Sequence, residues 1–194
     1  MEVLVVIAII IILAGILLPV LEHALRKAES VSCLSNMRNL ALGARLYADD
    51  YDGVIIPARL DDADGSLGIC WDVTMQAYVR NRQLLICPSD EAPTETAGCA
   101  SYPHSYGVNF LLSFVGEYNG SSLRLAQVEQ PSQTILFFEV RGKYRTFGAS
   151  YDADKLERVD RTRHGSGSNF AFLDGHAKWL RPEATVEPRN LWRP

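Results

Sequence analysis

The chain has no charged residue between Val3 and Leu21, nineteen consecutive positions of its 194 residues. It has no basic residue before this segment and no second segment of similar hydrophobicity after it. A secretory signal peptide has a basic start and a small-residue cleavage site, so that interpretation is disfavoured. A buried helix of a soluble protein is disfavoured because no other apolar segment is present to surround it. About 20 apolar residues cross a bilayer as a helix, so we predict a membrane span.

Patterns typical of catalysis and of nucleic-acid binding are also missing. The net charge of -4 offers no basic excess, and we predict no nucleic-acid partner. No G-x-S-x-G motif occurs, and the glycine-rich residues 165–168 do not form a phosphate-loop fingerprint. The cysteines form no C-x-x-C pair, so a zinc site has little support. We therefore predict that the protein is not an enzyme and has no catalytic residue, metal ligand or cofactor.

A helical pattern continues beyond the apolar segment. Apolar residues recur at steps of three and four and would form one face of an amphipathic helix, with Leu40 and Tyr47 beside it: Leu34, Met37, Ala41, Ala44 and Ala48. The aspartates and Gly53 of YADDYDG supply the stop. We predict one helix from residue 2 to about residue 50, roughly 70 Å long at 1.5 Å per residue. Gly15 and Pro19 are expected to loosen it locally.

The remainder reads as a head built from short elements. Residues Gln133–Val140 are β-formers and predict a central strand, and Val73–Tyr78 predict a short helix. The sequence NFAFLDGHAKWL predicts a hairpin with a two-residue turn at Asp174-Gly175. With that turn four apolar residues would share one face: Phe170, Phe172, Ala177 and Trp179. The proline-rich residues 181–194 are expected to lie extended over the surface.

These elements predict an α+β fold in which a long N-terminal helix packs on a small antiparallel sheet. We divide the chain into three regions. Residues 1–23 form an apolar transmembrane helix, residues 24–52 continue it as an amphipathic stem, and residues 53–194 form the β-rich head with its extended tail.

The N-terminal residues resemble a known family. Glu2, the apolar Val5–Ile10 and Pro19 fall in register with E-x-L-V-V-I-A-I-I-x-I-L-A-x-I-L-L-P-x-L, a pattern that is similar to type IV pilins and type II secretion pseudopilins. Residues 164–176 contain H…N-x-x-F-x-D-G-H, which is similar to the C-terminal hairpin of a large group of bacterial prepilin-type proteins.

The resemblance implies a structural subunit of a type IV pilus-like filament. Such subunits wait in the inner membrane, are processed by a prepilin peptidase, and are drawn by assembly machinery into a helical homo-oligomer on the bacterial cell surface. The carboxylate of Glu2 would meet the N-terminal amine of a neighbouring copy. The assembly residues that the resemblance implies are Glu2, Val3, Val5, Val6, Ile7, Ile9, Ile10, Leu13, Leu17 and Pro19.

Two other functions remain open. The first is a minor pseudopilin of a type II secretion system, which shares the stem but caps or initiates a short fibre. The second is a membrane-anchored binding protein or enzyme whose head acts alone. The sequence does not distinguish adhesion, motility, DNA uptake, secretion and electron transfer as roles of a filament.

The chain has four cysteines, at positions 33, 70, 87 and 99. An even number in an exported domain predicts two disulfides, and four cysteines allow three pairings. In similar proteins Cys33 and Cys87 tend to occur together, so the resemblance favours Cys33–Cys87 and leaves Cys70–Cys99. Buried free thiols are the alternative.

The best candidates for a metal or acid–base site are His164, Asp174 and His176, if facing strands bring them together. Asp174 is explained by its turn and His176 by the start of a strand, so we favour a structural role. The aspartates of YADDYDG lack the full twelve-residue calcium loop, and we read them as a helix-terminating turn. Because some pseudopilins bind calcium in the head, calcium is kept as an alternative cofactor.

Overall fold

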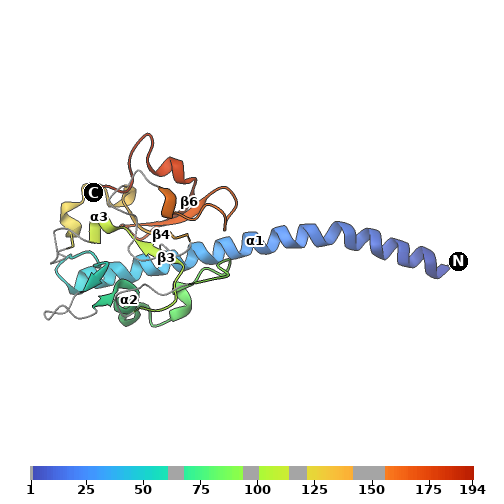
Figure 1. The fold of residues 1–194 in the computed structure, drawn as a ribbon, viewed down its shortest axis with the longest axis horizontal. Helices are drawn as coiled ribbons and strands as arrows, with labels where there is room; N and C mark the ends of the chain where they lie inside the picture. The colour runs from blue at the N-terminus through green and yellow to red at the C-terminus, as the bar shows by residue number, and fades with distance from the viewer. Residues whose placement is uncertain (1, 61–67, 94–100, 114–121, 142–155) are drawn as a thin grey trace.

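The computed structural model describes residues 2–60, 68–93, 101–113, 122–141 and 156–194. A single helix, α1 (Glu2–Asp50), runs for 49 residues. Its C-terminal half packs against the head, and its N-terminal half projects from the head as a free rod (Figure 1). The predicted α+β fold, with a long helix packed on small antiparallel sheets, is confirmed.

The helix begins and ends where the sequence predicts. Pro19 lies inside α1, and the expected loosening near Gly15 does not interrupt the helix. At the other end the N–H of Gly53 donates to the carbonyl of Ala48 at 2.7 Å. Asp52 and Gly53 have φ values of 52° and 80°, and this left-handed backbone terminates the helix.

One face of the C-terminal half of α1 is buried, as its periodicity predicts. Leu34, expected on this face, is only half-buried, and Cys33 lies deeper. The buried residues recur at helical spacing: Cys33, Met37, Leu40, Ala41, Gly43, Ala44, Tyr47 and Ala48. The head thus covers a stripe rather than surrounding the helix.

Within the described residues, the head contains two antiparallel sheets and several short helices. A two-stranded sheet pairs β1 (Arg59–Leu60) with β2 (Ile69–Cys70). A four-stranded sheet has the order β3-β4-β5-β6, with strands Tyr106–Val108, Ile135–Glu139, Ser168–Phe172 and Ala177–Leu180. The α-helices are α2 (Trp71–Val79) and α3 (Phe110–Ser113). Short 3-10 helices occur at Arg82–Leu85, Leu125–Gln127, Pro131–Gln133, Leu156–Arg158 and Pro182–Thr185.

The β5–β6 hairpin forms, but its predicted register is wrong by one residue. Phe170 pairs with Lys178, and Ala171 pairs with Ala177. The N–H of Phe172 donates to the carbonyl of His176, which leaves three residues in the turn instead of two. Because side chains alternate along a strand, this shift puts Phe170 and Phe172 on the face opposite Ala177 and Trp179.

Strands β3, β4 and β5 are buried on both faces of the sheet, whereas the edge strand β6 is partly exposed. One face packs on α1 and α2 in a core that includes Met37, Trp71 and Phe137. The other face carries a second core that includes Phe138 and Phe170. The C-terminal tail closes this second core with Trp192, which is 1% exposed. The expectation that residues 181–194 lie only over the surface is therefore wrong: the tail is anchored by one buried indole.

Candidate functional site

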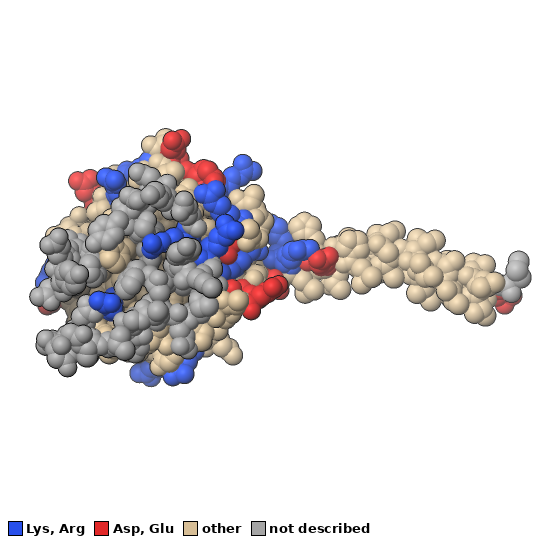
Figure 2. Space-filling model, in the orientation of Figure 1, with Lys and Arg blue, Asp and Glu red and all other residues tan. Residues whose placement is uncertain are grey.

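The projecting half of α1 is the first candidate functional surface. It is long and apolar enough to cross a membrane, and the head buries none of its apolar segment. Val3, Ile9 and Leu18 are exposed by 71%, 51% and 65%. Figure 2 shows this half as a rod without Lys, Arg, Asp or Glu on the visible face between its tip and the approach to the head. Every predicted assembly residue from Glu2 to Pro19 lies on this rod and is exposed.

Charged residues begin again at Glu22, directly after the apolar rod. Glu22 and Arg26 form an exposed ion pair one helical turn apart. The oxygen Oε2 of Glu29 accepts a hydrogen bond from Oγ of Ser89 at 2.8 Å, which links the stem to the head. The boundary between the apolar rod and the polar stem is therefore abrupt.

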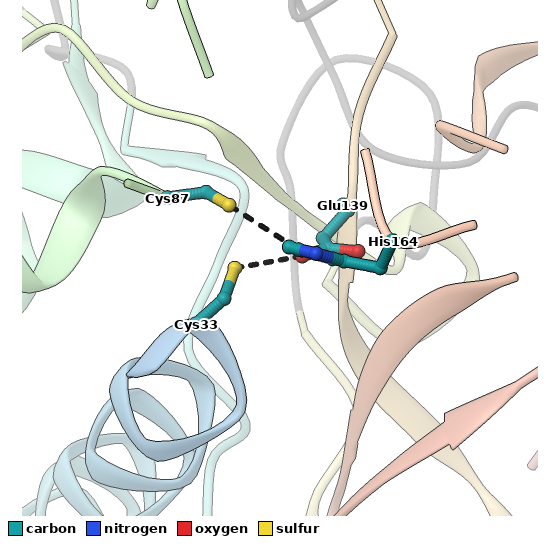
Figure 3. A group of neighbouring side chains, drawn as sticks. All are labelled: Cys33, Cys87, Glu139 and His164. Atoms are coloured by element: carbon teal, nitrogen blue, oxygen red, sulfur yellow. Dashed lines mark hydrogen bonds and ion pairs between the residues drawn. The ribbon is translucent and has the colours of Figure 1, made fainter. Parts of the chain in front are cut away.

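A second candidate site lies at the junction of stem and head. The side chains of Cys33, Cys87, Glu139 and His164 bring one ligand-type atom each to within 4.8 Å of one another. Cys33 comes from α1, Glu139 from β4, and Cys87 from the segment after the 3-10 helix Arg82–Leu85. His164 precedes β5. Figure 3 shows the two thiols approaching the glutamate–histidine pair from separate segments of the chain.

The contacts within this cluster are short and direct. Sγ of Cys33 donates to Oε1 of Glu139 at 2.7 Å. Nε2 of His164 lies 2.8 Å from the same carboxylate oxygen and 3.3 Å from Sγ of Cys87. The side chains of His164 and Glu139 are 1% and 0% exposed. Ionisable groups at this depth are costly unless they are paired, and here they are paired with one another.

A second layer of hydrogen bonds holds Glu139 and Cys33 in place. Oε2 of Glu139 accepts from Oγ of Ser168 at 3.0 Å and from the backbone N–H of Asn169 at 2.8 Å. Nδ2 of Asn169 donates to Oε1 at 3.2 Å. The hydroxyl of Tyr106 lies 3.0 Å from Sγ of Cys33. The carboxylate therefore has little freedom to rotate.

The cluster shifts the pKa of each of its members. Burial alone raises the pKa of Glu139, but the hydrogen bond and charge of His164 outweigh it and lower the pKa below its usual value. Burial lowers the pKa of His164, yet its contacts with Cys87 and Glu139 raise it to about 10. The side-chain interactions of Cys87 with Cys33 and His164 outweigh burial and lower the pKa of Cys87 to about 6, whereas burial raises the pKa of Cys33. The contacts thus favour the charged forms of Glu139 and His164, and they favour ionisation of Cys87 over that of Cys33.

The predicted disulfide between Cys33 and Cys87 is not formed, because both are free, buried thiols in the structure. Each sulfur instead has a polar partner from another segment, Glu139 for Cys33 and His164 for Cys87. Cys70 is disulfide-bonded, and its predicted partner, Cys99, lies outside the described residues.

The structure separates the three polar residues that the sequence grouped as a candidate site. Nδ1 of His176 contacts Oδ1 of Asp174 at 2.6 Å on the surface. His164 lies in the buried cluster, a different group of residues. Within the described residues that cluster is the one group of three or more close Cys, His, Asp or Glu ligands, and the aspartates of residues 49–52 do not belong to it.

Glu139 was missed in the sequence analysis. The sequence does single out Glu139, because it is the one charged residue in the β-forming segment QTILFFEV. An acid inside a buried strand requires a partner, and that argument identifies Glu139 but not its neighbours. His164 and Asn169, two residues of the H…N-x-x-F-x-D-G-H pattern, both contact its carboxylate.

A surface groove borders the cluster at His164. It has a volume of about 460 Å³ and lies between the stem and the head. The stem contributes His23, Lys27 and Leu34 to its wall, and the head contributes His164 and Trp179. Of the four cluster residues, His164 lines this groove, while its side chain is 1% exposed.

No protein-family model, curated protein or solved structure matches the chain.

Proposed function

We propose that the protein is a structural subunit of a type IV pilus-like extracellular filament that polymerises through the apolar half of α1. One observation carries the proposal: residues 3–21 form an apolar rod that the chain's own head leaves exposed on all sides. The register of Glu2, Val5–Ile10 and Pro19 with the pilin pattern supports the same function.

The physical argument concerns what can cover this rod. Full burial of one Val, Leu or Ile side chain stabilises by about 1.5–3 kcal/mol relative to exposure. A rod of such residues therefore does not remain in water, and its two stable environments are lipid and the rods of other copies. In lipid the hydrophobic drive for self-association is absent, so leaving the bilayer requires assembly machinery.

The arrangement of rod and head suits an open helical polymer. The rod lies at one end of the molecule and the head at the other (Figure 1). Contacts between unlike surfaces of successive copies generate open helical fibres when the rotation does not close. Rods bundled in the centre would leave the heads on the outside of the fibre.

Glu2 is the residue through which the proposal is most directly testable. It is exposed near the tip of the rod, and its carboxylate is the one charged side chain before Glu22. In a bundle of rods it would be desolvated, and a neighbour's N-terminal amine would supply the opposite charge and set the register between copies.

The experiment compares two glutamates on the same helix, in a host that supplies pilus-type assembly machinery. We expect Glu2→Ala to reduce sheared surface filaments at least tenfold while the chain stays in the membrane fraction. Glu22→Ala is the matched control, because Glu22 is exposed and pairs within its own helix with Arg26. Immunoblotting of the sheared fraction and negative-stain microscopy measure the outcome. Normal filaments from Glu2→Ala would contradict the proposal.

The second candidate is a membrane-anchored protein whose head acts alone. The free thiols and the groove at the stem–head junction favour it, because such groups are suited to binding. This function needs the rod only as an anchor, so Glu2→Ala would leave it intact. A wild-type chain that stays monomeric in the membrane with the machinery present would support this candidate.

A further inference from the structure

We propose that Cys33, Cys87, Glu139 and His164 bind one divalent transition-metal ion, with zinc the ion that best fits this ligand set. The proposal is independent of filament assembly and concerns the head and stem of a single chain. It differs from the sequence prediction of no metal ligand, which rested on the missing C-x-x-C pair.

The ligand set is the first argument. Two thiolates, one imidazole nitrogen and one carboxylate oxygen are all ordinary zinc ligands, and four protein ligands are typical of a structural site. Soft thiolates disfavour magnesium and calcium, which prefer oxygen ligands. The calcium alternative from the sequence therefore does not apply to this cluster.

The spacing of the ligand atoms is the second argument. A tetrahedral zinc ion, with bonds of about 2.3 Å to sulfur and 2.0 Å to nitrogen or oxygen, holds its ligands roughly 3.3–3.8 Å apart. The three contacts that join the ligand atoms measure 2.7, 2.8 and 3.3 Å. Each needs to lengthen by less than about 1 Å to admit the ion.

The surrounding hydrogen bonds are the third argument. Oε1 of Glu139 faces the cluster, while Ser168 and the backbone of Asn169 hold Oε2. The hydroxyl of Tyr106 lies beside Sγ of Cys33 and is positioned to donate to its thiolate. Metal ligands are commonly fixed by such outer partners, which orient them before the ion arrives.

The charge balance is consistent with a dication. The ion needs both sulfurs as thiolates and Nε2 of His164 without its proton, so that each offers a lone pair to the metal. The loaded site contains two thiolates, one carboxylate and one neutral imidazole around Zn²⁺, with a net charge of -1. Proton release accompanies metal binding at thiolate and histidine sites in general.

A bound ion would cross-link the stem to the head. The four ligands come from α1, β4 and two loops, so a single ion would join the stem to the head. It would act where the rod leaves the head, and it would resist bending there.

The first test measures metal in the full-length protein, extracted in detergent under reducing conditions after growth with added zinc. We expect about one zinc ion per chain by inductively coupled plasma mass spectrometry. Cys87→Ser and His164→Gln should each retain less than one tenth of it. His176→Gln is the matched control and should keep its zinc, because His176 is exposed and contacts Asp174. Circular dichroism reports whether each variant is folded.

A second measurement does not depend on variants. The wild-type protein is stripped with a chelator and titrated with Co²⁺ alone. We expect the near-ultraviolet thiolate-to-cobalt charge-transfer band and the visible bands of tetrahedral cobalt, and we expect Zn²⁺ to displace them. Zinc should also raise the thermal midpoint of the stripped protein by roughly 5 °C or more.

Two results would overturn the proposal. The first is a folded wild-type protein with no zinc and no cobalt bands. The second is a Cys33–Cys87 disulfide, detected by mass spectrometry in protein whose thiols were alkylated directly in cells. Neither result bears on the filament, which the Glu2→Ala experiment tests separately.

Discussion

At the scale of single residues, the buried guanidinium of Arg163 is held by partners from several segments of the head. Nε and Nη2 of Arg163 contact Asp160 and Asp90 at 3.0 and 3.1 Å. The same guanidinium donates to the carbonyls of Ser105 and Val140. Arg163 thus ties together loops that are distant in sequence, immediately before the cluster residue His164.

This network predicts a pH-dependent loss of stability. Burial raises the pKa of Asp160, but the N–H and O–H donors of Thr162 and the charge of Arg163 outweigh it and lower the pKa. A lowered pKa stabilises the fold above the unfolded value, and this contribution is lost as pH falls through the folded value. Asp160→Asn should therefore cost roughly 1–3 kcal/mol near neutral pH, and the difference from wild type should shrink below about pH 4.

Chemical denaturation of the detergent-solubilised chain at several pH values measures this difference. Glu183→Gln is the control, because Glu183 pairs with Arg161 on the exposed surface and should change stability by less than about 0.5 kcal/mol. A gap between Asp160→Asn and wild type that stays constant down to about pH 2.5 would contradict the assignment.

At the scale of elements, the packing of α2 on α1 depends on a close approach at Gly43. A Cβ at this position would lie 2.7 Å from Cε of Met75 and 2.8 Å from Cγ1 of Val79. The side chain of Met75 can bend away, but the β-branched Val79 has little freedom to do so. A small residue on α1 is therefore needed for α2 to reach the stem.

Gly43→Ala should destabilise the head by about 1–3 kcal/mol, although Ala normally favours a helix over Gly by about 1 kcal/mol. The double variant Gly43→Ala/Val79→Ala should recover part of the loss. Gly15→Ala is the control, because a Cβ there meets nothing within 4 Å. Thermal unfolding of the head in detergent measures each variant, and an unchanged midpoint for Gly43→Ala would argue against the close approach.

At the scale of the whole molecule, the head has two cores and the chain's end closes the second. The ring of Trp192 packs edge-on against Phe138 and Phe170, with centroids 5.0 and 5.9 Å apart. Its Nε1 donates to Oγ1 of Thr185 at 2.9 Å. Its carbonyl accepts from Nδ2 of Asn109 at 2.8 Å, which joins the tail to the segment after β3. The tail is therefore an integral part of the sheet's packing.

Trp192→Ala should cost about 3–5 kcal/mol of head stability, because it opens a cavity against Phe138 and Phe170. Trp192→Phe should cost less, since a ring remains in the core and only the indole hydrogen bond is lost. Denaturant unfolding measures both. A loss of less than about 1 kcal/mol for Trp192→Ala would mean that the tail does not seal this core.

The sequence by itself determined the features that depend on local periodicity. The charge-free residues 3–21 predicted the apolar rod. Apolar residues at helical spacing predicted the buried face of α1. The β-forming Gln133–Val140 predicted β4, and Asp174-Gly175 located the hairpin turn. A single added turn residue was enough to make the predicted register wrong, because strand faces alternate at every residue.

Only the tertiary structure decided the site. The cysteines and their polar partners lie 77 and 106 residues apart, and no spacing in the chain encodes those contacts. They meet because the sheet docks on one face of α1, which brings Glu139 and His164 against Cys33 and Cys87. Local patterns specify which face of an element is buried, whereas the partner that buries it depends on how all the elements pack together.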